Sequence, residues 1–213
     1  AIVPRETVPE QHEDLNVGIK VEVEDDNGNP LVGTVTHLTD QEVTVDANHP
    51  LAGKALSFDI EGMNALNEDI NMVGLYHALG VRQMLFAYNL NNAAAGGCHD
   101  LDTGLTPFGR EVVQEMNRVG MIVDCSHAGY RTTMDIMQVS QKPVVFSHSN
   151  PAAVWPHQRN IADEQIRACA ATGGVIGHNG LAIFRGDNDI GIDTMARHVC
   201  YVSDLVGSKH IGI

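Results

Sequence analysis

The sequence is poor in positive charge and has no long apolar run. Only 13 Lys and Arg residues stand against 27 Asp and Glu residues, which gives a formal net charge of -14. Nucleic-acid and anionic membrane partners need basic surfaces, so this balance argues against both. No apolar stretch approaches the ~20 residues that a membrane-spanning helix needs. We therefore expect a soluble protein.

Cysteine is also scarce. Cys98, Cys125, Cys169 and Cys200 show neither C-x-x-C spacing nor the density of a disulfide scaffold. No signal peptide is visible. These absences favour reduced thiols in a cytoplasm of bacterial type. The chain begins at Ala1 and stops inside the apolar run K-H-I-G-I, so we also expect both ends to be cut.

Length, charge and pattern together predict two parts. At 213 residues the chain suits one large domain or two modest ones. Residues 1–60 hold 3 basic and 12 acidic residues, whereas residues 61–213 hold 10 and 15. At the same place, alternating apolar and polar residues give way to helical segments that alternate with apolar strands. We expect domains over 1–60 and 61–213.

The first part is expected to form a small antiparallel β module. Apolar and polar residues alternate over 17–23, and Asn27-Gly28 marks the tight turn of a hairpin. Strands over 42–46 and 55–60 would complete the module.

The second part has the rhythm of an α/β protein. Helices are expected over 64–79, 106–120, 128–140, 161–172 and 194–206, and strands over 81–87, 121–123, 144–146, 174–177 and 210–213. With the strand near Ile60 this makes about six strands of parallel type. The pattern predicts a parallel sheet covered by helices, either doubly wound or a (β/α)8 barrel that is two units short.

Two of these strands are followed by a histidine. The apolar runs Met121–Val123 and Val144–Phe146 lead to His127 and His148, with a helical segment between them. In such a βαβ unit the parallel strands point the same way, so both histidines reach the C-terminal rim of the sheet. A single histidine more often caps or fills the edge of a core. The pair favours a site for a metal ion or a substrate.

The end of the first part carries a specific string. Val45–Glu61 reads V-D-A-N-H-P-L-A-G-K-A-L-S-F-D-I-E, after a V-P-R-E opening and a D-x-x-G-x-P turn. These residues resemble the C-terminal half of bacterial SlyD-like FKBP-type peptidyl-prolyl isomerases. The resemblance covers the tail of that family's flap insert and its last strand. Most of the prolyl-binding pocket is therefore expected to be missing, apart from Phe58.

Long, ordered motifs run through the second part. They are I-E-G-M at Ile60–Met63, G-V-R-Q-M at Gly80–Met84, G-L-T-P-F-G-R-E-V-V-Q-E-M-N-R-V-G-M-I-V-D-C-S-H at Gly104–His127, P-V-V-F-S-H-S-N at Pro143–Asn150, R-N-I-A-D-E at Arg159–Glu164 and G-G-V-I at Gly173–Ile176. Together they resemble the renal or membrane dipeptidase family (peptidase family M19), whose members are metal-dependent. The resemblance implies an incomplete (β/α)8 TIM-type barrel of about six β/α units, preceded by the small FKBP-type β module.

The resemblance also implies a site. In the family, two zinc ions share a glutamate and activate water to hydrolyse a dipeptide or a similar small amide. Glu61 matches the bridging, catalytic glutamate, and His127 and His148 match the two histidines of the second metal. Arg159 matches the arginine that holds the substrate carboxylate, a task that suits the forked guanidinium. Tyr88 stands where many members place a substrate-binding histidine.

Parts of the family's site have no match. The family places an H-x-D pair of metal ligands on its first barrel strand, and we expect these ligands to be absent before Glu61. The catalytic aspartate is expected just beyond Ile213. We therefore predict a zinc-dependent dipeptidase-like hydrolase that is weak or inactive as written and holds at most one zinc ion. An open barrel exposes strand edges, so a homo-oligomer is a further expectation.

Two other functions stay open. A SlyD-like peptidyl-prolyl isomerase or chaperone fragment would place the activity in the first part. A scaffold protein with a degenerate barrel would have no activity. Metal content separates the scaffold from the hydrolase, because a chain that binds no zinc at His127 and His148 would favour the scaffold.

Overall fold

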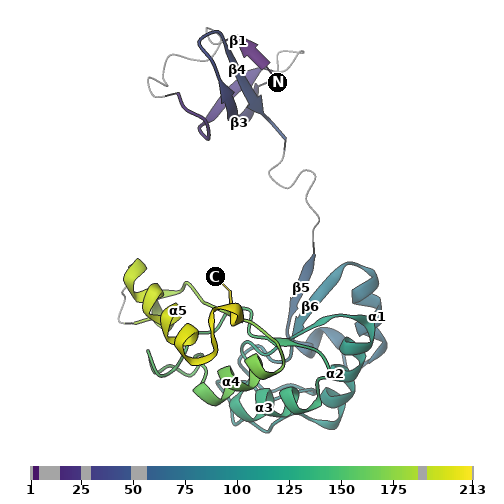
Figure 1. Ribbon diagram of the computed structural model, residues 1–213. Helices are drawn as coiled ribbons and strands as arrows, with labels where there is room; N and C mark the ends of the chain where they lie inside the picture. The colour runs from purple at the N-terminus through teal and green to yellow at the C-terminus, as the bar shows by residue number, and fades with distance from the viewer. Residues whose placement is uncertain (1, 5–14, 25–29, 49–56, 187–190, 213) are drawn as a thin grey trace. The chain divides into compact units, whose positions relative to one another are not determined.

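The computed structural model describes residues 2–4, 15–24, 30–48, 57–186 and 191–212 (Figure 1). The chain divides into two compact units, Ala1–Leu56 and Ser57–Ile213. This division falls slightly before the boundary expected from the sequence. The predicted turn at Asn27-Gly28 lies outside the described residues.

The described residues of the first unit form a four-stranded antiparallel sheet. Its strands are β1 (Ile2–Pro4), β2 (Lys20–Glu24), β3 (Pro30–Leu38) and β4 (Glu42–Asp46), in the spatial order β1-β4-β3-β2. Alternating apolar residues of the strands form a small core with Leu15: Val21, Val23, Val35, Val43 and Val45. The predicted antiparallel module is therefore present. The strand expected over 17–23 begins only at Lys20, and Val17 is exposed.

The second unit is built on short parallel strands. One sheet has the order β5 (Phe58–Glu61), β6 (Val81–Leu85), β7 (Ile122–Asp124), β8 (Val144–Val145), and a second pairs β9 (Ile176–Gly177) with β10 (Ile211–Gly212). A parallel bridge between Phe146 and Ile176 joins the two sheets. The strand predicted over 55–60 is thus β5, and it pairs with β6 instead of with the antiparallel sheet.

In the described part of the chain, five α-helices connect these strands, as the sequence pattern predicted for an α/β fold. They are α1 (Asn71–Ala78), α2 (Pro107–Val119), α3 (Tyr130–Val139), α4 (Asp163–Ala171) and α5 (Ile192–Val206). Each helix packs against the next one in the chain, and α1 to α4 line one side of the unit in Figure 1. No described helix is long and apolar enough to cross a membrane.

Local signals explain the limits of α2. The hydroxyl of Thr106 accepts a hydrogen bond of 3.0 Å from the backbone N–H of Gly109, and Pro107 occupies the first helical position. The helix ends at Gly120, whose φ of 83° is readily adopted by glycine. These are the positions expected from the sequence.

The helix predicted over 64–79 is interrupted. Asn67 and Glu68 have positive φ values of 48° and 59°, a conformation that a helix cannot contain. They separate the 3₁₀ turn η2 (Met63–Leu66) from α1. The prediction of one continuous helix was wrong for this reason.

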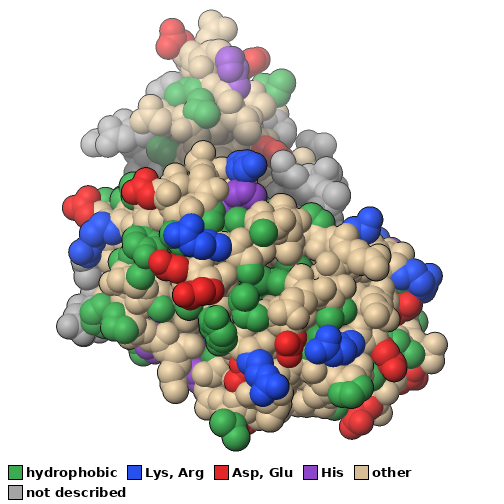
Figure 2. Space-filling view, turned by 60° about the horizontal axis from the view of Figure 1, so that its bottom comes forward, with side chains coloured by type: hydrophobic (Ala, Val, Ile, Leu, Met, Phe, Trp, Pro, Cys, Tyr) green, Lys and Arg blue, Asp and Glu red, His purple; other side chains and the backbone are tan. Residues whose placement is uncertain are grey.

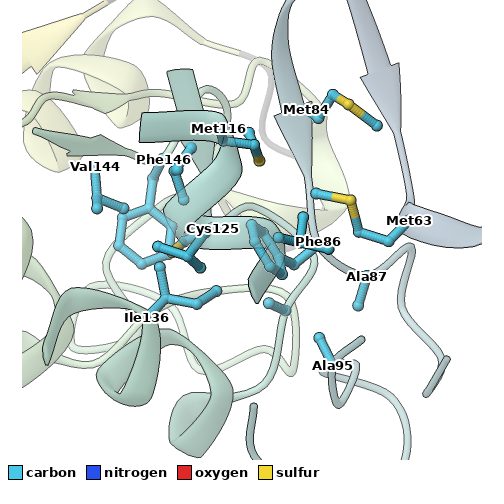
Figure 3. Close-up of a cluster of buried hydrophobic side chains, with 14 of the residues drawn as sticks. Met63, Met84, Phe86, Ala87, Ala95, Met116, Cys125, Ile136, Val144 and Phe146 are labelled. Carbon is cyan, nitrogen blue, oxygen red and sulfur yellow. The ribbon is translucent and has the colours of Figure 1, made fainter. Parts of the chain in front are cut away.

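A large apolar core lies beneath the strand ends. Figure 3 shows Met84 of β6, Cys125 after β7 and Phe146 after β8 packed with side chains from η2, α2 and α3. Phe146 is fully buried, which is worth roughly 2–3 kcal/mol for a side chain of this size. At the surface, in the view of Figure 2, acidic and basic side chains are interspersed with apolar ones. The core provides a firm base for the residues at the rim.

Candidate metal centre

The three side chains predicted to bind metal meet at the C-terminal ends of the strands. Glu61 is the last residue of β5, His127 follows β7 and His148 follows β8. These strands are parallel members of one sheet, so their ends lie at the same rim. The fold therefore brings these residues together.

The ligand atoms are close enough to share one ion. The Nε2 atoms of His127 and His148 lie 2.8 Å apart, and Oε1 of Glu61 lies 3.8 Å from Nε2 of His148. The three ligand atoms lie within 4.8 Å of one another. Ligands around a tetrahedral zinc ion are ~3 to 3.5 Å apart, so this spacing fits a single ion. Within the described ranges no other His, Cys, Asp and Glu side chains form such a group of three.

His127 is held by residues that follow β6. Its Nδ1 lies 2.7 Å from Oδ1 of Asn89, and the ring of Tyr88 stacks on it with the centroids 4.4 Å apart. Asn89 and His127 both have left-handed backbone, with φ of 65° and 66°. An amide oxygen only accepts hydrogen bonds, so Nδ1 carries the proton and Nε2 presents its lone pair to the rim.

His148 is held from inside the sheet by a chain of hydrogen bonds. Its Nδ1 lies 2.7 Å from Oγ of Ser147, which donates to Oδ2 of Asp124. Because this hydroxyl donates to the carboxylate, it accepts from Nδ1, and Nε2 of His148 again keeps its lone pair. Asp124 is fully buried and accepts three further hydrogen bonds, from Ser126 N at 2.8 Å, Ser147 N at 3.2 Å and Gln83 Nε2 at 3.0 Å.

Both imidazoles are neutral near neutral pH. Burial lowers the pKa of His127 to about 3, and the charges of Arg159 and two neighbouring histidines add to this effect. Burial and Arg159 also lower the pKa of His148, against the opposing effects of Asp124 and Glu61. Neutral imidazole is the form that binds metal. Charge, orientation and spacing therefore all fit a metal ion.

Arg159 lies at the same rim. Its side chain is buried and donates from one nitrogen to Oγ of Ser149 at 3.3 Å and from another to the carbonyl of His148 at 3.0 Å. Its Nε has no hydrogen-bond partner in the described part of the chain, where no acidic side chain forms an ion pair with it either. A buried charge without a counter-ion is costly. The arrangement suits an anionic ligand.

Two residues that orient the ligands were missed from the sequence. Asn89 stands directly after Tyr88, and Ser147 stands directly before His148. A single sequence does not show which neighbouring side chain turns toward a ring. Tyr88 itself is 53% exposed and reaches the site through its stacking on His127.

The expectation that no H-x-D pair precedes Glu61 overlooked one match in the sequence. His12-Glu13-Asp14 spells the H-x-D pattern before Glu61. These residues lie outside the described ranges, so the structure does not place them.

A rim where neutral imidazoles and a carboxylate meet at the ends of parallel strands, beside a buried arginine, is typical of a metal-dependent hydrolase. Comparison with known proteins identifies the family. The sequence profile of the membrane dipeptidase family (peptidase family M19) matches residues 33–213. The chain belongs to this family of metal-dependent dipeptidases.

Curated relatives include two fungal proteins. An uncharacterised dipeptidase of Schizosaccharomyces pombe is 32% identical over 167 residues, which cover 75% of this chain and 40% of the relative. The dipeptidase tcpJ of Claviceps purpurea is 33% identical over 168 residues, which cover 76% of this chain and 40% of the relative. The chain thus spans less than half the length of these relatives.

Solved structures share the fold. An amidohydrolase from Pseudomonas aeruginosa aligns with a TM-score of 0.71 and 38% identity, over 73% of this chain and 48% of that one. A metallopeptidase from Rhodobacter sphaeroides, liganded with a phosphinate mimic of the dipeptide L-Ala-D-Ala, aligns with a TM-score of 0.70 and 28% identity, over 74% of this chain and 48% of that one.

These comparisons give no support to the SlyD-like interpretation of residues 1–60. The dipeptidase match begins at residue 33, inside that part. A small sheet of alternating valines is compatible with many β modules, so its presence does not specify an isomerase.

Proposed function

We propose that the second unit carries the metal site of a zinc-dependent dipeptidase. Glu61, His127 and His148 hold a zinc ion, Arg159 holds the terminal carboxylate of a dipeptide, and Tyr88 contacts the substrate. The proposal is carried by the 2.8 Å approach of two neutral imidazoles beside a buried guanidinium. The dipeptide mimic bound to the Rhodobacter sphaeroides relative supports the substrate class.

Each residue has a part in the proposed reaction. When bound, zinc supplies a Lewis acid for the scissile carbonyl and for water. Arg159 orients the substrate through its carboxylate, which sets the peptide bond beside the histidines. The side chain of Glu61 is 44% exposed, so a carboxylate oxygen can bind a second ion or accept a proton. The hydroxyl of Tyr88 can donate to the oxygen on which negative charge develops.

The proposal includes the type of fold and the number of metal ions. We take the strands β5 to β10 as six strands of a (β/α)8 barrel, the fold implied by the family's motifs. The described residues offer one group of three ligands, so they hold one zinc ion. A site that normally uses two ions should hydrolyse peptides more slowly when it holds one. We expect the rate to be lower by a factor on the order of a thousand or more.

Kinetics with matched substrates test the proposed roles. Chelation of zinc should abolish hydrolysis of dipeptides, and added zinc should restore it. Arg159→Met should raise KM about tenfold or more for dipeptides, and much less for carboxy-amidated analogues. Arg118→Met is the control, because Arg118 is an exposed arginine on α2 that pairs with Glu115. Equal effects on both substrates would remove Arg159 from carboxylate recognition.

A further inference from the structure

The 3₁₀ turn η3 (Ala182–Phe184), which follows β9, lies against Arg159. The Cζ atom of Arg159 is 5.7 Å from the centroid of the Phe184 ring. The ring of His157 meets Phe184 edge-on, with the centroids 4.9 Å apart. Phe184 thus covers one side of the guanidinium that is proposed to hold the substrate carboxylate.

The turn is tied to the loop that carries Arg159. Asn150 and Asn160 both donate from Nδ2 to the carbonyl of Phe184, at 3.2 and 2.8 Å. Trp155 donates from Nε1 to the carbonyl of Ile183 at 3.2 Å. Three side chains of the loop therefore set the position of the Phe184 backbone, so the ring forms a fixed wall beside the guanidinium.

Among the described residues, neither η3 nor the loop that carries Arg159 places an acidic side chain beside this wall. Burial and nearby positive groups lower the pKa of His157, so this ring is neutral near pH 7. Burial lowers the pKa of Arg159, and the carboxylates that oppose this effect at longer range are those of Asp124 and Glu61, which belong to β7 and β5. Of the described residues, a substrate side chain next to Phe184 would meet its aromatic surface and the positive charge of Arg159.

We propose that Phe184 forms the wall of the subsite for the side chain of the dipeptide's C-terminal residue, and that the site selects apolar residues such as leucine there. The inference rests on the proposed function. The Cβ of that residue is two bonds from the carboxylate carbon, so its side chain lies within reach of the ring that covers the guanidinium. Contact with the ring should favour leucine over glycine about tenfold or more. A lysine side chain would meet the like charge of Arg159.

Binding of dipeptide mimics to the zinc-loaded full chain tests the proposal. The probes are phosphinate mimics of Ala-Gly, Ala-Leu and Ala-Lys, measured by calorimetry, and the matching dipeptides, measured by hydrolysis. The unchanged chain should bind the Ala-Leu mimic at least about tenfold more tightly than the Ala-Gly mimic, and the Ala-Lys mimic least tightly. Phe184→Ala should bring the ratio of Leu to Gly close to 1 without weakening the Ala-Gly mimic. Phe184→Leu should keep most of the ratio.

Ile183→Ala is the matched control. Ile183 belongs to the same turn and is 60% exposed, so its truncation should leave the ratio unchanged. An equal loss for all three mimics in both Phe184 variants would show that Phe184 only supports the fold, and preference for the Ala-Lys mimic would also overturn the proposal. If the unchanged chain binds none of the mimics with zinc present, the proposed function itself fails, and the subsite fails with it.

Discussion

The two histidines of the site are supported in different ways. His148 is held through Ser147 by Asp124, which is fully buried and accepts four hydrogen bonds. His127 is held by Asn89 and by the ring of Tyr88, which is 53% exposed. One support belongs to the interior of the sheet and the other to the surface after β6.

Because of this difference, substitutions on the two sides should affect stability and metal affinity differently. The buried support connects the orientation of His148 to the folding of β6, β7 and β8, since Asp124 binds donors from these strands and the residues after them. The exposed support of His127 can change without opening the core. We therefore expect substitutions on the His148 side to reduce both stability and metal affinity, and those on the His127 side to reduce affinity alone.

Asp124→Ala should have the largest effect. It leaves the backbone N–H groups of Ser126 and Ser147 without their acceptor, at ~1–3 kcal/mol for each buried group. It also removes the acceptor of the Ser147 hydroxyl, whereas the Gln83 amide keeps its second acceptor, Oδ2 of Asp59 at 3.3 Å. We expect the free energy of unfolding to fall by ~3 kcal/mol or more, and zinc binding to be lost. Urea denaturation with and without zinc measures both. A stability loss below ~1 kcal/mol would show that the buried network does not hold this side of the site.

Ser147→Ala distinguishes the orientation of the His148 ring, measured by zinc affinity, from the stability of the fold. Asp124 keeps its other donors, so we expect a stability loss of only ~1 kcal/mol. The affinity for zinc should fall by ~10- to 100-fold, because Nδ1 of His148 loses the acceptor that sets its tautomer. Zinc titration by calorimetry checks this, with the exposed Ser208→Ala as the control. Unchanged affinity would mean that the hydroxyl does not orient His148.

Asn89→Gly tests the exposed side. Glycine adopts the φ of 65° without strain, so this variant removes the amide and keeps the backbone. We expect the affinity for zinc to fall by less than ~10-fold and the stability by less than ~1 kcal/mol, since Tyr88 still packs on His127. Asn89→Ala should be less stable than Asn89→Gly. An affinity loss as large as that of Ser147→Ala would erase the difference between the two sides.

The smallest effect is expected from the titration of His127 in the metal-free chain. Its pKa is lowered to about 3 in the folded state, whereas the unfolded chain takes up this proton near ~6.5. The unfolded state therefore binds more protons between these values, and His127 reduces stability as the pH falls from ~6.5 toward 3. The slope is less than ~1.4 kcal/mol per pH unit, and smaller where water screens the ring.

A variant isolates this contribution. Burial, with the charges of Asp124 and Glu61, raises the pKa of Asp59 to about 6, which makes Asp59 act in the opposite direction as the pH falls. Asp59 is present in both His127→Gln and the unchanged chain, so its contribution cancels when their slopes of stability against pH are subtracted. Equal slopes would contradict a neutral, buried His127.

Much of the rim could be predicted because its histidines follow apolar strands directly. The runs before His127 and His148, with a helix between them, were enough to place both rings at one edge of a parallel sheet. Glu61 and Arg159 were predicted only from the family's motifs, since neither residue follows a pattern that distinguishes it from a surface charge.

Ser147 and Asn89, which contact the two histidines, could not be predicted from one sequence. Ser147 meets Asp124 because β7 and β8 pair in a particular register, and a sequence does not specify that register. The break at Asn67-Glu68 was missed for a related reason, because the apolar spacing of a helix continues across it. Tertiary contacts decide both features.

Glu61, His127 and His148 are proposed to bind one zinc ion, and this is the central claim about the site. Calorimetric titration of the metal-free chain with zinc should give one ion per chain. His127→Ala and His148→Ala should each lower the affinity by at least ~100-fold, or ~2.7 kcal/mol, whereas the exposed His37→Ala on β3 should leave it unchanged. A double variant of His127 and His148 that binds zinc with the same stoichiometry and affinity as the unchanged chain would contradict the account.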